Sequence, residues 1–245
     1  MKDKILLCIT GKWRDEVDFV EKLSAGTEGR FIATGGHIFD RQKRTACEFN
    51  VSPSVEGMEA AFKIGSSAAP IPDSLLDEIA RHKSYLSLYA QNNGIAEAFT
   101  ISEVALAALE SGGLAVRVEG SKRASDPDRW REHLQNAQEI SPSFLCHLFV
   151  WAFVQEAGTY NTIGMPFLGQ PDFSIETSDF DTASAIYDEF AKYLLIQQPT
   201  VLNGQTIRFE DADGRWRITK ANHIYIDDPD IDFSRGMWRL QRISD

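Results

Sequence analysis

Gly11 and Lys12 follow an apolar run, Lys4 to Thr10, in the way that a phosphate-binding loop follows a strand. In such a loop, backbone amides and a lysine hold the phosphates of a nucleotide, and a following Ser or Thr binds magnesium. The sequence lacks the upstream glycine of this motif, and Trp13 stands where the Ser or Thr is needed. We therefore expect only a turn between a strand and a helix at this point.

Two pairs of residues have the types needed for acid-base or nucleophilic catalysis. His37 and Asp40 could form a dyad, but in a strand their side chains point to opposite faces unless a bulge at Gly35-Gly36 redirects one of them. Cys146 and His147 could act as nucleophile and base, but adjacent side chains also point apart in the strand that we expect there. We therefore predict no catalytic residues, with His37 an ordinary histidine and Cys146 a small core residue.

The spacing of the metal-binding residue types indicates no metal site. The histidines show neither HxH nor HxxxH spacing, and no cysteine lies near enough to complete a zinc set. The segment Asp211 to Gly214 is similar to part of a calcium loop, but it lacks a third ligand and the closing glutamate, so we interpret it as a hairpin turn. We therefore predict no metal and no cofactor. The histidines considered are His37, His82, His133, His147 and His223.

The densest group of acidic residues lies in DDPDIDFSRG, Asp227 to Gly236. One interpretation is a solvated loop that charge repulsion keeps open. A second is a contact for a basic protein, in which a nearby tryptophan acts as an aromatic anchor. Weak calcium binding is a third. The candidate partner-binding residues are Asp227, Asp228, Asp230, Asp232 and Trp238.

The overall composition narrows the class of protein. With 245 residues, of which 43% are hydrophobic and 25% charged, the chain is typical of an ordered globular protein. The 36 acidic and 25 basic residues give a net charge of −11, which repels phosphate backbones and anionic lipids, so we expect no nucleic-acid and no membrane partner. No apolar run approaches the roughly 20 residues of a membrane helix. The three widely spaced cysteines fit a reducing compartment, and we expect a cytoplasmic protein.

Periodicity and turn residues divide the first part of the chain into elements in the order βαββαβ. The helix after Pro72 is the best marked, because acidic residues lie in its first turn and basic residues in its last. The polar stretch Asp40 to Glu56 predicts a loop. In chain order, we expect a strand at 4–10, a helix at 15–23, strands at 30–39 and 57–65, a helix within 66–82 and a strand at 84–90.

A similar series of elements follows a connecting helix at Ile95 to Ser111. Asp126 is expected to cap the next helix, with Pro127 in its first turn. Asp213 and Gly214 predict a hairpin turn. In chain order, we expect a strand at 114–120, a helix at 125–138, strands at 142–158, 162–167 and 173–176, a helix at 179–198, and strands at 206–211 and 215–221.

From this order of elements we predict an α+β fold with two successive βαββαβ halves of the ferredoxin-like type and largely antiparallel sheets. Residues 1–93 would form the first half, residues 94–113 the connecting helix, and residues 114–245 the second half with the C-terminal strands. The halves share no visible sequence similarity. We expect them to form one compact unit.

The segment NTIGMPFLGQPDFSIE, residues 161–176, places glycines and prolines inside an extended pattern. A phosphate-binding loop would lead from a strand into the N-terminus of a helix, whereas strand character resumes here at Phe173. Gly169 to Pro171 have the residue types of a tight connection. We therefore interpret the segment as a bend or bulge and not as a ligand loop.

This segment, the following helix that ends in YLL, and the strand NGQTIRFED resemble the C-terminal region of DUF4261, a bacterial family catalogued only as a domain of unknown function. A Gly-x-x-x-x-Gly-x-Pro-acidic pattern of the family is matched from Gly164 to Asp172, and its dGxTi strand from Asn203 to Ile207. With APIPDSLLDEIARHKSYLSLYA, the resemblance covers about Ala69 to Thr219. It implies no catalytic residues. Pro166 departs from the pattern by lying inside a predicted strand, which argues against a central strand there.

The negative charge and the lack of a catalytic constellation favour a non-enzymatic protein-binding module, of an immunity or antitoxin type, that binds a basic protein. The alternative is an enzyme or small-ligand sensor with a pocket between the two halves. A deep pocket with converging polar groups would favour the alternative, whereas a flat acidic face would favour the binding module.

Overall fold

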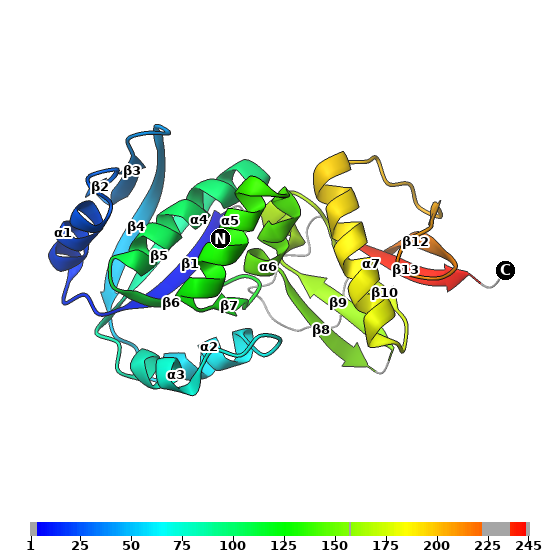
Figure 1. The fold of residues 1–245 in the computed structure, drawn as a ribbon, viewed down its shortest axis with the longest axis horizontal. Coiled ribbons are helices and arrows are strands. Elements are labelled where there is room, and N and C mark those ends of the chain that lie inside the picture. Colours follow the sequence, from blue (N-terminus) through cyan, green and yellow to red (C-terminus); the bar gives the residue numbers. More distant parts are fainter. Residues whose placement is uncertain (1–3, 157, 222–235, 244–245) are drawn as a thin grey trace.

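Two sheets, formed by successive parts of the chain, carry the fold of the computed structural model (Figure 1). The structure describes residues 4–156, 158–221 and 236–243. Within these ranges one sheet has seven strands and the other six, and neighbouring strands are mostly antiparallel. Helices pack against both sheets. The protein therefore has the predicted α+β fold class.

The first sheet has the strand order β2-β3-β4-β5-β1-β6-β7 and is antiparallel throughout. Ile5, Leu7 and Ile9 of its interior strand β1 are fully buried in the main core. The strands are β1 (Lys4–Gly11), β2 (Phe31–Thr34), β3 (His37–Asp40), β4 (Thr45–Pro53), β5 (Ser84–Gln91), β6 (Gly113–Val118) and β7 (Ala124–Ser125).

Three helices contribute apolar side chains to this core: α1 (Glu16–Gly26), α4 (Ile95–Glu110) and α5 (Pro127–Glu139). The side chain of Asp126 accepts a hydrogen bond from the Arg129 backbone N–H and caps α5, as predicted. Two further helices, α2 (Met58–Gly65) and α3 (Asp73–Ala80), form a smaller apolar cluster with β6 and β7.

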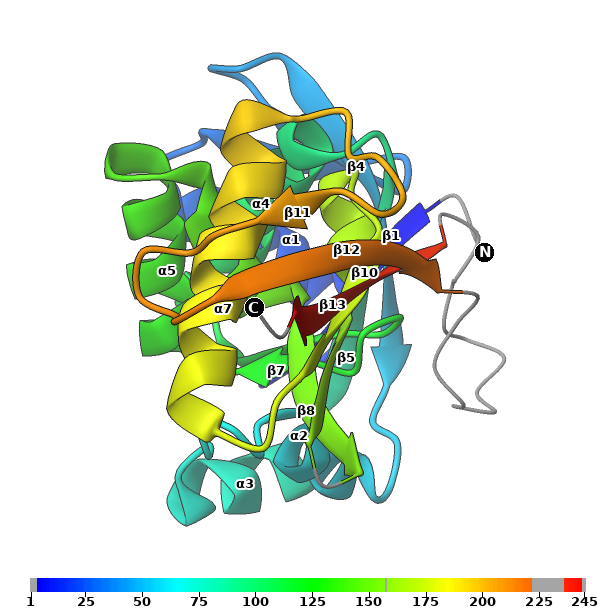
Figure 2. The same ribbon diagram turned by 90° about the vertical axis from the view of Figure 1, so that its right-hand side faces the viewer.

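The second sheet has the strand order β11-β12-β13-β10-β9-β8. Its strand β13 lies between β12 and β10 and is parallel to β10 (Figure 2). Helix α7 (Phe180–Lys192) packs on this sheet, with the rings of Phe190 and Phe173 5.1 Å apart, and continues into the π-helical turn η3 (Tyr193–Gln197). The strands are β8 (Trp151–Glu156), β9 (Thr159–Ile163), β10 (Asp172–Glu176), β11 (Thr206–Ile207), β12 (Arg215–Ala221) and β13 (Met237–Ile243).

Two short helical turns join the sheets where the sequence pattern predicted one long strand. The 3₁₀ helix η1 (Pro142–Leu145) is followed by α6 (Cys146–Phe149), and the strand begins only at Trp151. The strand prediction for residues 142–149 was wrong because Ser141 caps the first turn, accepting a hydrogen bond from the Ser143 N–H, and proline takes its first position.

Two more predictions were wrong in the first half. Residues 58–65 form helix α2, in which Phe62 is fully buried while Ile64 is 60% exposed. The predicted loop at residues 40–56 contains β4, in which buried Cys47 and Phe49 alternate with exposed neighbours. In both segments, the burial of one face determines the secondary structure. The pattern of that face is hard to recognise in the sequence, because the first segment is short and the second is largely polar.

Strand β6, which we expected to open the second half, pairs with β1 in the first sheet. The two ferredoxin-like halves are therefore not confirmed. Among the described residues, no helix is long and apolar enough to cross a membrane.

Residues 161–176 form a bend, as predicted, but the strand predicted at 162–167 was wrong. The chain leaves β9 at Ile163 and turns from Gly164 to Gly169, because Gly164 takes a positive φ and Pro166 lies in the first turn of a 3₁₀ helix. Strand β9 leads into the 3₁₀ turn η2 (Met165–Leu168), which contains Pro166, and β10 follows. Gly164 enters this turn with a φ of 121°. An oxygen of Asp172 accepts hydrogen bonds from the Met165 N–H (3.1 Å) and from the Thr162 hydroxyl (3.0 Å), which closes the bend.

Candidate functional site

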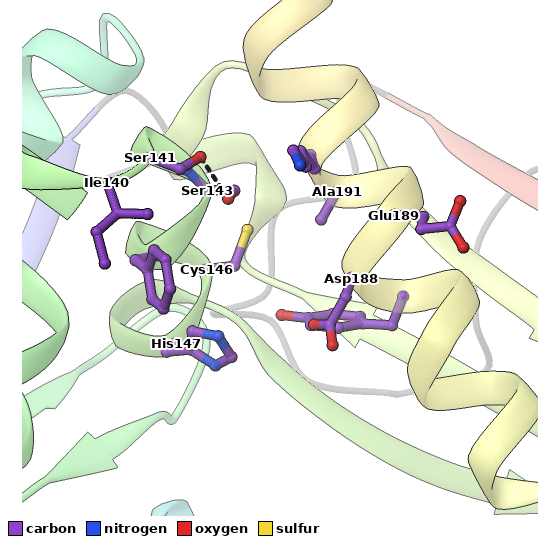
Figure 3. A pocket seen from close by; sticks show the side chains of 11 residues that line it. Ile140, Ser141, Ser143, Cys146, His147, Asp188, Glu189 and Ala191 are labelled. Atoms are coloured by element: carbon purple, nitrogen blue, oxygen red, sulfur yellow. Dashed lines mark hydrogen bonds between the residues drawn. The ribbon is translucent and has the colours of Figure 1, made fainter. Parts of the chain in front are cut away.

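A cavity of about 370 Å³ lies between η1 and α6 on one side and α7 on the other (Figure 3). It is bounded by parts of the chain that are far apart in sequence. Its walls combine apolar and aromatic surface with hydroxyl and titratable groups. The lining includes Ser141, Phe144, Cys146, His147, Tyr187 and Asp188.

The cap and the apolar face of α7 place its cavity residues. Asp179 caps the helix by accepting a hydrogen bond from the Thr182 N–H (2.9 Å). Ile186 and Phe190, one helical turn apart, are fully buried against the sheet. Because residues two apart lie on different faces of a helix, Asp188 is directed away from the sheet and toward α6.

Asp188 and His147 extend from opposite walls and point toward each other (Figure 3). In the part of the chain that the structure describes, neither side chain forms a hydrogen bond or an ion pair. Burial raises the pKa of Asp188 and lowers the pKa of His147, and each group's charge opposes part of the other's shift. The two pKa values therefore move toward each other, as suits groups that exchange protons with one ligand.

Cys146, from α6, and Tyr187, from α7, also line the cavity, and Cys146 is buried while Tyr187 is partly buried. Burial raises the pKa of Cys146 to about 12, so its thiol is not a nucleophile at neutral pH. Burial also raises the pKa of Tyr187. Cys146 is 2% exposed and belongs to the main core, as predicted, although it lies in a helical turn and not in a strand.

A second histidine and a buried arginine lie behind His147. The rings of His133 and His147 stack with centroids 4.8 Å apart. Arg123, which is 8% exposed, donates a hydrogen bond from Nε to the carbonyl oxygen of His147 (3.1 Å). Burial, with the nearby charges of His147 and Arg123, lowers the pKa of His133 to about 4. This arrangement fixes the backbone that carries His147 and keeps both rings neutral.

The low pKa of His133 predicts a loss of stability in weak acid. Between about pH 6.5 and pH 4 the unfolded chain binds a proton at this residue and the folded chain does not, so the free energy of unfolding falls as the pH falls. His133→Gln should flatten this part of the profile, as measured by urea unfolding at several pH values. His37→Gln, at an exposed histidine, is the matched control. A profile that stays equally steep in His133→Gln would contradict the assignment.

The predicted partner-binding residues are divided by the structure. Asp227, Asp228, Asp230 and Asp232 lie outside the described residues, so their role stays a prediction. Trp238 lies in β13 opposite Phe173 and Lys220, is 8% exposed and belongs to the main core. Within the described residues, the Trp238 side chain is buried and is not an exposed aromatic anchor.

The other sequence candidates lie away from the cavity. His37 is exposed and Asp40 is buried, on opposite faces of β3 as predicted, and Asp40 forms an ion pair with Arg30. Lys12, after the first strand, forms an ion pair with Glu78. No three His, Cys, Asp or Glu residues within the described ranges lie close enough together to hold a metal ion.

Sequence reasoning missed Asp188 entirely and dismissed His147. The two lie on different helices, so no local spacing joins them. One signal was present. Ser141 and Pro142 mark a helix start, and with that start recognised, His147 would not have been placed in a strand.

By its fold, the chain is an α+β protein with two mainly antiparallel sheets. Over residues 161–233 it matches the family model described as "Domain of unknown function (DUF4261)", which confirms the resemblance over that segment. The match includes the bend and α7 but does not extend back to Ala69. No curated protein and no solved structure matches the chain.

Proposed function

We propose that the protein binds a small polar ligand in the cavity between α6 and α7, either as a sensor or as an enzyme. The observation that carries this proposal is the pair His147 and Asp188, which face one cavity without a hydrogen-bond partner among the described residues. His147 is partly buried, and such polar groups normally have partners, so an imidazole that faces a cavity without one favours an external partner. The exposed carboxylate of Asp188 on the opposite wall gives that ligand a second polar contact.

The chemistry of the walls indicates how such a ligand would be held. Asp188 and His147 would contact polar groups at its two sides, and their shifted pKa values allow either group to donate or accept a proton. Phe144 and Tyr187 would cover its apolar part. Arg123 would keep His147 in position through the carbonyl hydrogen bond.

The protein purified from its own cell should carry a small molecule, detected by native mass spectrometry. Because a hydrogen bond to a charged group contributes about 1.5–3 kcal/mol, Asp188→Asn and His147→Gln should each weaken binding of that molecule roughly tenfold to a hundredfold. Asp181→Asn, an exposed carboxylate on the same helix, is the matched control. Equal retention by all variants, or no bound molecule, would count against the site.

A second candidate is the protein-binding module of immunity or antitoxin type that the net charge of −11 favours. Ile32 and Phe39, cross-strand partners in the β2–β3 hairpin at one end of the first sheet, support it because they are 38% and 41% exposed. The same purification separates the two candidates. A basic protein recovered in equal amount, with no small molecule, would favour this second function.

Two finer points of the fold and location are also proposals. Four neighbouring strands of the first sheet have the order β6-β1-β5-β4. Strands β1 and β4 run in the same direction on the two sides of β5, and strands β5 and β6 run in the same direction on the two sides of β1. This arrangement supports a ferredoxin-like core in the first sheet. The three cysteines are unpaired and buried, which supports a reducing compartment such as the cytoplasm.

A further inference from the structure

A buried arginine without a negatively charged partner lies behind the candidate site. Arg123, just before β7, is 8% exposed, and its Nε donates a hydrogen bond to the carbonyl oxygen of His147 (3.1 Å). Its two terminal nitrogens form no hydrogen bond and no ion pair with any residue that the structure describes. A buried charge normally has an ionic partner, because taking an unpaired ion out of water is very costly. The guanidinium therefore fits an anionic partner from outside the chain.

The nearest charged group adds positive charge instead of compensating it. Burial lowers the pKa of Arg123, and the nearby charge of Arg129 lowers it further. Arg129 belongs to α5, which packs against α6 (Figure 1). Of the two arginines, only Arg129 has an ion pair with a described carboxylate, that of Asp126 (Nε to Oδ2 3.5 Å), and Asp126 also caps α5. In a chain whose net charge is −11, such an excess of buried positive charge indicates a specific use.

His133 completes the cluster. It lies one helical turn after Arg129 on the same face of α5. Its Nδ1 atom is buried and has no hydrogen-bond partner in the described part of the chain. Burial and the nearby charges of His147 and Arg123 lower its pKa to about 4, so at neutral pH the ring is neutral and carries one N–H group. An arginine and a histidine of one cluster thus both have polar atoms without partners.

The terminal nitrogens of Arg123 can be reached from solvent. The described polar atoms that are fully enclosed and have no partner include Nδ1 of His133 but not these nitrogens. Part of the small exposed surface of Arg123 therefore belongs to them. A small ion can approach the guanidinium without unfolding of the chain.

From the unpaired guanidinium, its reachable nitrogens and the second arginine beside it, we propose that Arg123, Arg129 and His133 bind a small oxyanion, either a phosphate or a carboxylate. The fork of an arginine binds two oxygens of either group through parallel hydrogen bonds. The site involves the backbone of His147, whereas the proposed polar ligand contacts the His147 side chain. This inference therefore goes beyond the proposed function and does not depend on it.

Calorimetric titrations of the full chain with sodium phosphate and with sodium acetate test the anion. Sodium chloride keeps the ionic strength constant, because screening alone changes with salt. We expect saturable binding of at least one oxyanion, with one ion per chain, and the tighter of the two identifies the class. No saturable binding, or the same response to a chloride titration, would overturn the proposal.

Two arginine variants of α5 locate the ion. Arg129→Gln should weaken binding about tenfold, because a hydrogen bond between charged groups is lost. Arg131→Gln is the matched control, since Arg131 lies on the same helix and pairs with Glu110 and Asp128. It should change the affinity no more than about twofold. Equal weakening by the two variants would mean that only the overall charge attracts the ion, which contradicts the site.

Arg123→Met tests the buried charge itself and should abolish saturable binding. Added oxyanion should raise the melting temperature of the unaltered chain, because it binds the folded state, but not that of Arg123→Met. A folded Arg123→Met that binds the ion as tightly as the unaltered chain would overturn the proposal. If this variant does not fold, the comparison of Arg129→Gln with Arg131→Gln still decides.

Discussion

The substitution Gly164→Ala is expected to lower the free energy of unfolding by about 3 kcal/mol or more. Gly164 has a φ of 121°, a conformation that side chains rarely adopt. An added Cβ would also collide with the carbonyl oxygen of Phe149, a backbone atom that cannot move without displacing the end of α6. The change would be measured as a shift of the midpoint in urea unfolding.

Gly204→Ala is the matched control for this prediction. Gly204 also has a positive φ, of 86°, but nothing lies within 4 Å of an added Cβ. This variant should lose only the roughly 1–2 kcal/mol of backbone strain. If Gly164→Ala loses no more than Gly204→Ala, the close contact with Phe149 is not rigid, and the bend tolerates movement.

Asp172→Ala is the second substitution with a large expected effect, a loss of about 2–4 kcal/mol. Asp172 is 1% exposed, and one of its oxygens accepts the Met165 N–H and the Thr162 hydroxyl. Alanine would leave the buried Met165 N–H without this acceptor, and Thr162 would keep only its contacts with Phe173. Hydrogen exchange of the Met165 amide should then become faster, in step with the lower stability.

Two further variants test whether the effect of Asp172→Ala comes from its hydrogen bonds in the bend. Asp181→Ala, at an exposed carboxylate of α7, should change stability by no more than about 0.5 kcal/mol. Asp172→Asn keeps an acceptor oxygen and should lie between the two alanine variants. Asp172→Ala with the stability of Asp181→Ala would mean that the carboxylate does not hold the bend.

These two positions explain the pattern that marks the family segment. In the Gly-x-x-x-x-Gly-x-Pro-acidic pattern, Gly164 and Gly169 both have positive φ, and Asp172 bonds back to the turn between them. The pattern thus encodes a bend between β9 and β10, and its acidic residue is committed to the protein's own backbone. A resemblance based on it predicts a fold segment and not a reaction.

The extent to which the sequence predicted the fold depended on local signals. Helix α5 was found because Asp126 and Pro127 mark its start, and the bend because glycine and proline have strong backbone preferences. Strand β4 was missed although Cys47 and Phe49 alternate with polar residues, because its polar composition outweighed the period of two. The sequence did not indicate to which sheet β6 belongs, because strand pairing depends on residues far apart in the chain.

The candidate site was still less accessible to sequence analysis. His147 and Asp188 have no common motif, and they meet because α7 packs across the helical turns that precede the second sheet. Burial and packing, which the sequence does not state, create the cavity between α6 and α7.

The placement of β13 has a consequence for synthesis on the ribosome. Met237–Ile243 leaves the ribosome after every other described strand, yet it lies between β10 and β12. The first sheet can therefore close while translation continues, whereas one edge of β10 and one edge of β12 stay unpaired until β13 arrives. Unpaired strand edges are sites of wrong pairing and aggregation, so the arrival of β13 closes the most exposed stage of the second sheet.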